Sequence, residues 1–252
     1  MVFEYTKLHM VQLPIFKAFL PFFRFFFELQ CINCRTNLSD VETYICNECY
    51  QKLYFITKPR CIRCSHPFYT DSSVDYTCGE CERKKFFFER VICLVSYEGT
   101  AKALIQKCKY GKDYSIGTYM SFLMSTNISF PIAKIHYIVP VPLTKKKLKS
   151  RGFNQSYILA SRIAQKYKIT LVDTLIKNHE TTAQVGLGVK ERRHNQIETS
   201  LTLSHDTMFQ GKNILVVDDV YTTGTTLNAC AKVLKRGGAK KIYGYVFART
   251  VK

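Results

Sequence analysis

The sequence lacks an unbroken apolar run long enough to cross a membrane, which takes about 20 apolar residues. Residues 1–30 come nearest, because seven phenylalanines lie between positions 16 and 27, but Lys17, Arg24 and two prolines interrupt them. They also lack a small-residue cleavage site before Cys31. We therefore expect a cytoplasmic protein. Residues 1–30 are expected to form a helix that packs its aromatic face on the rest of the protein, and contact with a membrane surface is the alternative.

Acidic residues are scarce as well. Only 19 Asp and Glu stand against 37 Lys and Arg, which gives a formal net charge of +18. The chain stays strongly basic even if eight thiolates bind two zinc ions. Such a surplus favours phosphorylated small molecules, nucleic acid or anionic membranes as partners. No low-complexity segment is evident, and 46% hydrophobic residues exclude wholesale disorder.

Cysteine, in contrast, is abundant. Eight of the eleven cysteines form four CxxC pairs, a spacing typical of metal ligands rather than disulfides in a chain that is not secreted. The expected ligands are Cys31, Cys34, Cys46, Cys49, Cys61, Cys64, Cys78 and Cys81. The other three, Cys93, Cys108 and Cys230, fall on apolar positions of expected strands or helices and are interpreted as core residues.

The four pairs form an internal repeat, because two CxxC pairs with eleven residues between them are followed by two pairs with thirteen. Two copies of one small metal-binding unit explain this pattern. Four thiolates complete a closed tetrahedral site, so residues 31–88 are predicted to form a zinc-ribbon-like domain with two structural Zn²⁺. Sequential pairing of the cysteines fits the repeat best, and a cross-braced pairing stays open.

Beyond residue 88 the composition changes, and short β-rich runs alternate with helical patterns. This order predicts an α/β domain over residues 89–252, with a parallel sheet flanked by helices. The expected strands are 91–97, 135–141, 214–217 and 241–248. The expected helices are 101–109, 115–126, 154–167 and a fourth around 227–234.

The stretch ILVVDDVYTTGTT at residues 214–226 carries the strongest chemical signal. A buried strand would deliver Asp218 and Asp219 at its carboxyl end, where open α/β sheets bind ligands. A tight turn at Gly224 would then start a helix, and backbone N–H groups at a helix N-terminus favour an anion. The stretch contains neither GxGxxG nor GxxxxGK[ST], which disfavours a dinucleotide fold and a P-loop NTPase.

This stretch closely resembles the phosphoribosyl pyrophosphate motif of type I phosphoribosyltransferases. The resemblance implies that Asp218 and Asp219 hold the ribose hydroxyls of phosphoribosyl pyrophosphate (PRPP), which binds with Mg²⁺. It also implies that the 5′-phosphate is wrapped by Thr222, Thr223, Gly224, Thr225 and Thr226. In purine salvage enzymes of this class an acid typically stands where this chain has Thr222, which argues against hypoxanthine or guanine salvage.

The same resemblance implies a pyrophosphate site and a lid. The loop 143–151 follows an expected strand and brings Arg151 and several lysines, which could neutralise pyrophosphate. Residues 181–195 combine glycines with Arg192 and Arg193, as a loop that closes over the leaving group would. The candidate catalytic residues are Asp218, Asp219, Arg151, Arg192 and Arg193.

The order VPVPL…RGFNQ, AQ-x-GL-x(4)-RR-x-N and VVDDVYTTGTT behind four CxxC pairs resembles the ComF family of competence-associated proteins. The sequence Lys109-Tyr110-Gly111 also fits that family. The resemblance implies a role in natural transformation and DNA uptake, with single-stranded DNA and a ComFA-like helicase as possible partners. The leading hypothesis is a phosphoribosyltransferase. One alternative is a non-catalytic DNA-binding factor that keeps the ligand site, and the other is a zinc-dependent adaptor for the helicase.

Overall fold

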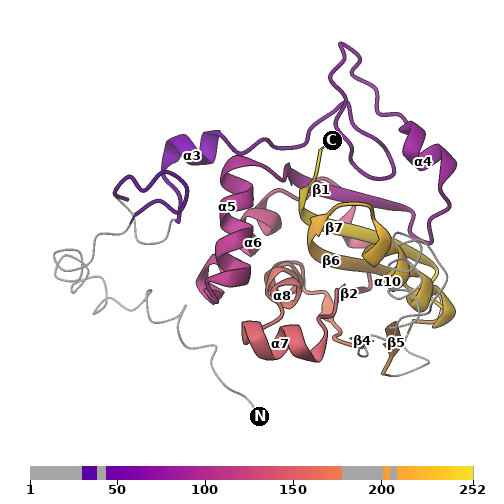
Figure 1. Cartoon of the computed structure of the whole chain (residues 1–252). Coiled ribbons are helices and arrows are strands. Elements are labelled where there is room, and N and C mark those ends of the chain that lie inside the picture. Colours follow the sequence, from indigo (N-terminus) through magenta and orange to yellow (C-terminus); the bar gives the residue numbers. More distant parts are fainter. Residues whose placement is uncertain (1–29, 39–43, 178–200, 205–208, 252) are drawn as a thin grey trace, which may run out of the picture.

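The computed structural model of the chain describes residues 30–38, 44–177, 201–204 and 209–251 (Figure 1). Its centre is a five-stranded parallel sheet in the order β1-β7-β6-β2-β3. The strands are β1 (Arg90–Ser96), β2 (Tyr137–Pro140), β3 (Thr170–Leu171), β6 (Asn213–Tyr221) and β7 (Lys241–Arg249). The parallel sheet predicted for this part of the chain is confirmed.

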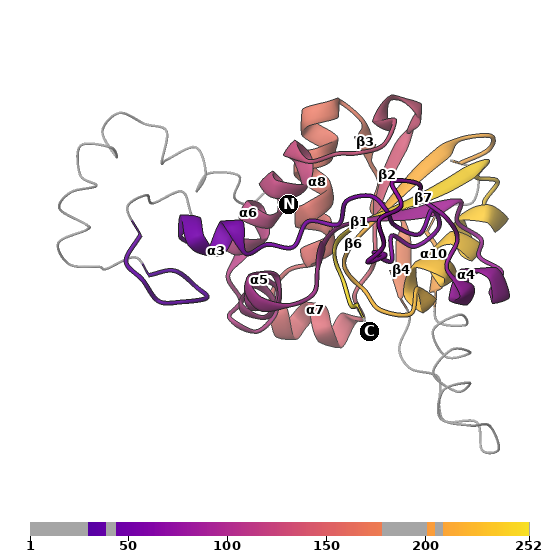
Figure 2. The ribbon, with the colours of Figure 1, turned by 90° about the horizontal axis from the view of Figure 1, so that it is seen from above.

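Helices cover both faces of the sheet (Figure 2). One face packs against α5 (Gly99–Tyr110), α6 (Tyr114–Thr126) and α8 (Gln155–Tyr167), and the other against α10 (Thr225–Arg236). Successive residues of β6 alternate between these layers, because Leu215 and Val217 join the first core while Ile214 and Val216 join the second. A strand that is buried on both faces has a continuous apolar sequence, which is why residues 214–217 (ILVV) predict a buried strand.

The eight predicted strands and helices of this region are all present, with ends shifted by a few residues. One segment differs from the expectation, because residues 143–151, predicted to be a loop, contain the helix α7 (Lys145–Arg151). The Thr144 side chain caps its first turn by accepting a hydrogen bond from the Lys147 N–H at 3.3 Å, and Gly152 ends it with φ +84°. The structure also adds an antiparallel pair, β4 (Leu175–Lys177) and β5 (Leu201–Leu203).

The two cysteine units pack on different sides of this body. The first contains α3 (Asn47–Gln51) and lies against α5 and α6, where the rings of Tyr44 and Tyr119 are 5.6 Å apart. The second contains α4 (Gly79–Arg83) and lies beside β1, whose Val91 N–H donates to the Arg63 carbonyl at 2.7 Å. Residues 54–56 also hydrogen-bond to β1, so the edge of the sheet that β1 forms is covered.

None of the helices in the described part of the chain is long and apolar enough to span a membrane. The helix expected over residues 1–30 lies outside the described residues except for Gln30. That expectation stays a prediction.

Candidate functional site

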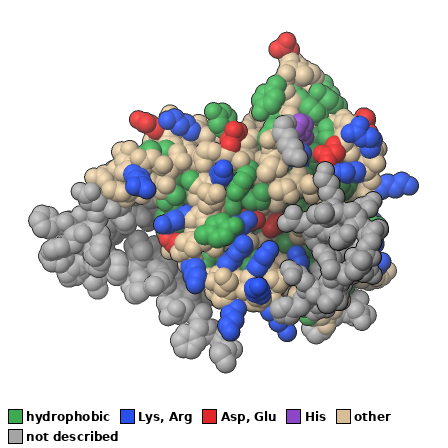
Figure 3. Space-filling view, in the orientation of Figure 1, with side chains coloured by type: hydrophobic (Ala, Val, Ile, Leu, Met, Phe, Trp, Pro, Cys, Tyr) green, Lys and Arg blue, Asp and Glu red, His purple; other side chains and the backbone are tan. Residues whose placement is uncertain are grey.

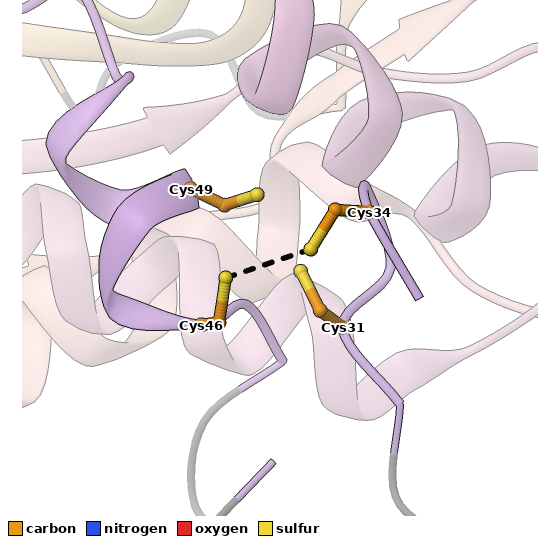
Figure 4. Close-up of side chains that lie close together, drawn as sticks. All are labelled: Cys31, Cys34, Cys46 and Cys49. Carbon is orange, nitrogen blue, oxygen red and sulfur yellow. Dashed lines mark hydrogen bonds between the residues drawn. The ribbon is translucent and has the colours of Figure 1, made fainter. Parts of the chain in front are cut away.

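Two clusters of four cysteines are the first candidate centres. They consist of Cys31, Cys34, Cys46 and Cys49, and of Cys61, Cys64, Cys78 and Cys81, with the sulfurs of each cluster within 4.8 Å of one another. Figure 4 shows the four sulfurs of the first cluster converging from a loop and from the start of α3. The structure therefore has the sequential pairing, and not the cross-braced one.

The sulfur separations fit tetrahedral zinc. The Sγ atoms of Cys34 and Cys46 are 3.6 Å apart, and those of Cys64 and Cys78 are 3.8 Å apart. A zinc ion bound at about 2.3 Å per sulfur separates its thiolates by about 3.8 Å. A bound zinc ion would hold all four sulfurs of each cluster as thiolates, because only the deprotonated sulfur is a ligand. Both clusters are structural zinc sites.

The clusters differ in how far they are embedded. Cys34 of the first cluster is exposed, whereas Cys61, Cys64 and Cys81 of the second are buried and belong to the core that also contains β6 and α10. The second cluster is thus part of the hydrophobic core beneath the sheet. In the first cluster, Cys31 and Cys49 are buried in the core on the α5 and α6 side, whereas Cys34 is exposed.

The three remaining cysteines are core residues, as expected. Cys93, Cys108 and Cys230 are all buried. Burial raises the pKa of Cys93 and of Cys108 to about 12, so both stay neutral thiols.

The acidic pair lies near the carboxyl end of β6, as predicted. Asp218 Oδ1 accepts hydrogen bonds from the Ser156 hydroxyl and from the Asp219 N–H, each at 2.9 Å. Burial, reinforced by the neighbouring charge of Asp219, raises the pKa of Asp218 to about 7. Because burial disfavours the charged form of Asp218, a hydrogen-bond donor or a cation that comes within reach stabilises its carboxylate.

Asp219 has a partner that the sequence analysis did not assign to the site. The ammonium group of Lys109, in the last turn of α5, lies 2.8 Å from Asp219 Oδ2. The sequence Lys109-Tyr110-Gly111 does not indicate which group the lysine meets, because its partner is 110 positions away. Ser156 was missed for the same reason, because its partner is 62 positions away.

The predicted phosphate loop connects β6 to α10. Gly224 is the residue before α10 and has φ +79°, a conformation that favours glycine. A Cβ at this position would lie 2.8 Å from Cζ of Tyr221, so the loop backbone rests directly on that ring. The Thr223 and Thr225 hydroxyls are 2.9 Å apart, and Thr222 and Thr223 are exposed at the helix N-terminus. This arrangement can accept an anion.

The segment Arg-Gly-Phe-Asn-Gln joins the basic helix α7 to the acidic pair. Asn154 caps α8 by accepting from the Ser156 N–H at 3.0 Å, and it donates to the Val141 carbonyl at 3.0 Å. Arg151 ends α7 and lies three residues before Asn154, so the chain brings it to the carboxyl end of β2, next to Val141. Figure 3 shows Lys and Arg side chains gathered over α7.

The structure therefore brings Asp218, Asp219, Arg151 and the loop 222–226 to one edge of the sheet. Arg192, Arg193 and the rest of the expected lid, residues 181–195, lie outside the described residues. Their roles remain predictions.

Comparison with known proteins agrees with this architecture. Residues 149–250 match the phosphoribosyl transferase domain family, and residues 22–82 match the double zinc ribbon domain family. Competence protein F of Haemophilus influenzae is 28% identical over 234 residues, which cover 89% of this chain and 98% of that protein. Competence protein ComFC of Bacillus subtilis is 25% identical over 225 residues, 88% of this chain and 85% of that protein. DNA utilization protein YhgH of Escherichia coli K12 is 27% identical over 174 residues, 65% of this chain and 74% of that protein.

Fold, cysteine clusters and matching domains define a double zinc ribbon joined to a type I phosphoribosyltransferase fold. Within that class, the chain is similar over most of its length to the homologues named competence protein F and ComFC, as its motifs predicted.

Proposed function

We propose that this protein binds PRPP together with Mg²⁺ and acts as a phosphoribosyltransferase in the handling of DNA. The observation that carries the proposal is the acidic pair Asp218 and Asp219, which is buried at the carboxyl end of β6 and followed directly by the open N-terminus of α10. Carboxylates beside an anion site match a ligand that carries vicinal hydroxyls next to a phosphate.

Each group has a chemical task in this proposal. The ribose hydroxyls donate to Asp218 and Asp219, and the 5′-phosphate accepts from the N–H and hydroxyl groups of residues 222–226. Arg151 and Lys109 offset the charge of the pyrophosphate. In the reaction, the bond between the ribose C1 and a pyrophosphate oxygen breaks as a nucleophile bonds to C1, so a developing positive charge on the ribosyl centre needs stabilisation.

Mg²⁺ fits the donor set, because carboxylate oxygens and phosphates are its usual ligands. When bound, it would neutralise the leaving pyrophosphate. Thr222 cannot act as a base at neutral pH, so the acceptor is not expected to be a purine that an acid at this position assists.

Calorimetric titration of PRPP with Mg²⁺ into the zinc-loaded full chain tests the proposal. We expect micromolar binding, lost in Asp218→Asn/Asp219→Asn and kept in the matched control Asp71→Asn, whose side chain is exposed on the second zinc unit. A well-folded wild type that does not bind PRPP would contradict the proposal.

The role in DNA handling is supported by the names of the relatives, two competence proteins and a DNA utilization protein. The test is natural transformation in a competent host that lacks its own homologue. We expect the wild-type chain to restore transformants and Asp219→Asn to fail at equal protein level. Full rescue by that variant would mean that the ligand site is dispensable for this role.

A non-catalytic factor that binds single-stranded DNA or a ComFA-like helicase is the second candidate, and an exposed aromatic side chain favours it. Tyr69 of the second zinc unit is 85% exposed, whereas the neighbouring rings of Phe68 and Tyr76 stack on each other with centroids 3.8 Å apart. An exposed ring in a basic protein suits base stacking. Salt-sensitive binding of single-stranded DNA that survives Asp219→Asn and weakens in Tyr69→Ala would favour this candidate.

A further inference from the structure

Arg249 connects the second zinc cluster to the phosphate loop. It is the last residue of β7 and is 4% exposed. Its Nη1 donates to the carbonyl oxygen of Cys64, one of the cluster's four cysteines, at 3.0 Å. Its guanidinium carbon lies 4.8 Å from the centre of the Tyr221 ring. One buried side chain therefore contacts both a zinc ligand and the residue that precedes the phosphate loop.

Tyr221 is held from several sides. It is 3% exposed and pairs with Arg249 in the register of β6 and β7. Its carbonyl accepts from the Thr250 N–H at 3.0 Å. Its ring lies directly under Gly224, because a Cβ there would be only 2.8 Å from Cζ. The position of the Tyr221 ring therefore determines the position of the turn at Gly224, where α10 begins.

We propose that Arg249 is a positioning residue, and that the second zinc cluster orders the phosphate loop through Cys64, Arg249 and Tyr221. The inference rests on the proposed binding of PRPP at residues 222–226. A cation over an aromatic ring and a charged hydrogen bond to a buried carbonyl are both stronger when desolvated. The bound zinc fixes the Cys64 backbone, and the guanidinium transmits that fixed position to the ring and so to Gly224.

The first cluster makes no such connection in the described part of the chain. Its cysteines pack with the core on the α5 and α6 side, whereas Tyr221 belongs to the core of the second cluster. The two zinc sites should therefore differ in their effect on ligand binding, although both stabilise the fold.

Arg249→Met tests the inference, with Arg60→Met as a matched control. Arg60 is also buried, at 8% exposure, but it donates to the Ile56 carbonyl and to the Ser129 hydroxyl, away from the loop. We expect both variants to keep two zinc ions per chain by elemental analysis and to melt at lower temperature. Only Arg249→Met should bind PRPP about tenfold more weakly, the equivalent of about 1.4 kcal/mol, and show faster amide exchange at residues 222–226.

A second pair of variants addresses the zinc ions themselves. Cys78→Ser and Cys46→Ser each remove one partly exposed ligand, from the second and the first cluster respectively. We expect PRPP binding to weaken in Cys78→Ser and to be unchanged in Cys46→Ser.

Equal PRPP affinities in Arg249→Met and Arg60→Met, or equal effects of the two cysteine variants, would overturn the inference. If the wild type does not bind PRPP at all, the proposed function fails, and amide exchange still decides the inference. Residues 222–226 that exchange no faster in Arg249→Met than in Arg60→Met would then overturn it.

Discussion

The ammonium group of Lys109 and Oδ2 of Asp219 lie 2.8 Å apart, so an ion pair joins the last turn of α5 to the carboxyl end of β6. The side chains are 19% and 7% exposed, and salt screens such a pair less than one on the surface. Lys109 also opposes the rise in the pKa of Asp218 that burial causes. The lysine therefore places a positive charge directly beside the acidic pair.

Replacing this lysine should weaken ligand binding. Lys109→Met leaves the Asp219 carboxylate without its cation and removes one positive charge from beside the expected pyrophosphate. We expect PRPP to bind at least tenfold more weakly by calorimetry, since truncating one partner of a buried pair costs about 2 kcal/mol or more. Lys102→Met, on an exposed position of the same helix, is the control. Equal affinities of the two variants would remove Lys109 from the site.

The raised pKa of Asp218 predicts a pH-dependent stability. The folded protein holds this proton up to about pH 7, whereas the unfolded chain releases it near the ordinary value of 3.8. The contribution of Asp218 is therefore complete below about pH 4, falls as the pH rises towards 7 and is constant above. Asp218→Asn keeps a carbonyl oxygen for Ser156 and has no proton to lose.

Unfolding at pH 5 and pH 7.5, without ligand, measures this difference. We expect the stability of the wild type to fall relative to Asp218→Asn between the two pH values. Protonation of the zinc ligands affects both proteins alike and cancels in the comparison. A difference that is independent of pH would contradict the raised pKa.

Gly224→Ala should damage both the fold and the ligand site. Alanine at φ +79° is strained by about 1 kcal/mol, and its Cβ would also overlap the Tyr221 ring. The matched control is Gly152→Ala, where φ is +84° but a Cβ meets nothing within 4 Å. We expect Gly224→Ala to lower the free energy of unfolding more than Gly152→Ala, and to abolish PRPP binding. Equal losses of unfolding free energy in the two variants would show that the close contact with Tyr221 is unimportant for stability.

Loss of zinc from the second cluster should lower the stability of the protein more than loss of zinc from the first. Cys64 is buried among core residues of β6 and α10, whereas Cys34 is exposed. We expect Cys64→Ser to lower the melting temperature well below that of Cys34→Ser, with one zinc lost in each. Calorimetric unfolding and elemental analysis of both variants check this. A larger loss in Cys34→Ser would contradict the assigned packing.

The parts of the site that could be predicted from sequence are local ones. Two CxxC pairs close a tetrahedron within a short stretch of chain, so spacing alone indicates the ligands. The strand, the acids and the turn of residues 214–226 are also contiguous. Each of these features depends on neighbours in sequence, and each lies where expected.

The missed features depend on distant partners. Lys109 meets Asp219, which is 110 positions along the chain, and Arg249 meets Cys64 across 185 positions. Helix α7 was missed for another reason, because its lysine-rich sequence has no apolar face and its ends are set by Thr144 and Gly152. Sequence patterns indicate which residues are buried and where turns occur, but they do not indicate which buried side chains contact each other.

The most direct test of the central claim is an electron-density map of the zinc-loaded full chain crystallised with PRPP and Mg²⁺. We predict the 5′-phosphate at the N–H groups of residues 222–226 and the ribose hydroxyls on Asp218 and Asp219. Ligand density at another place, with these residues free of contact, would contradict the account.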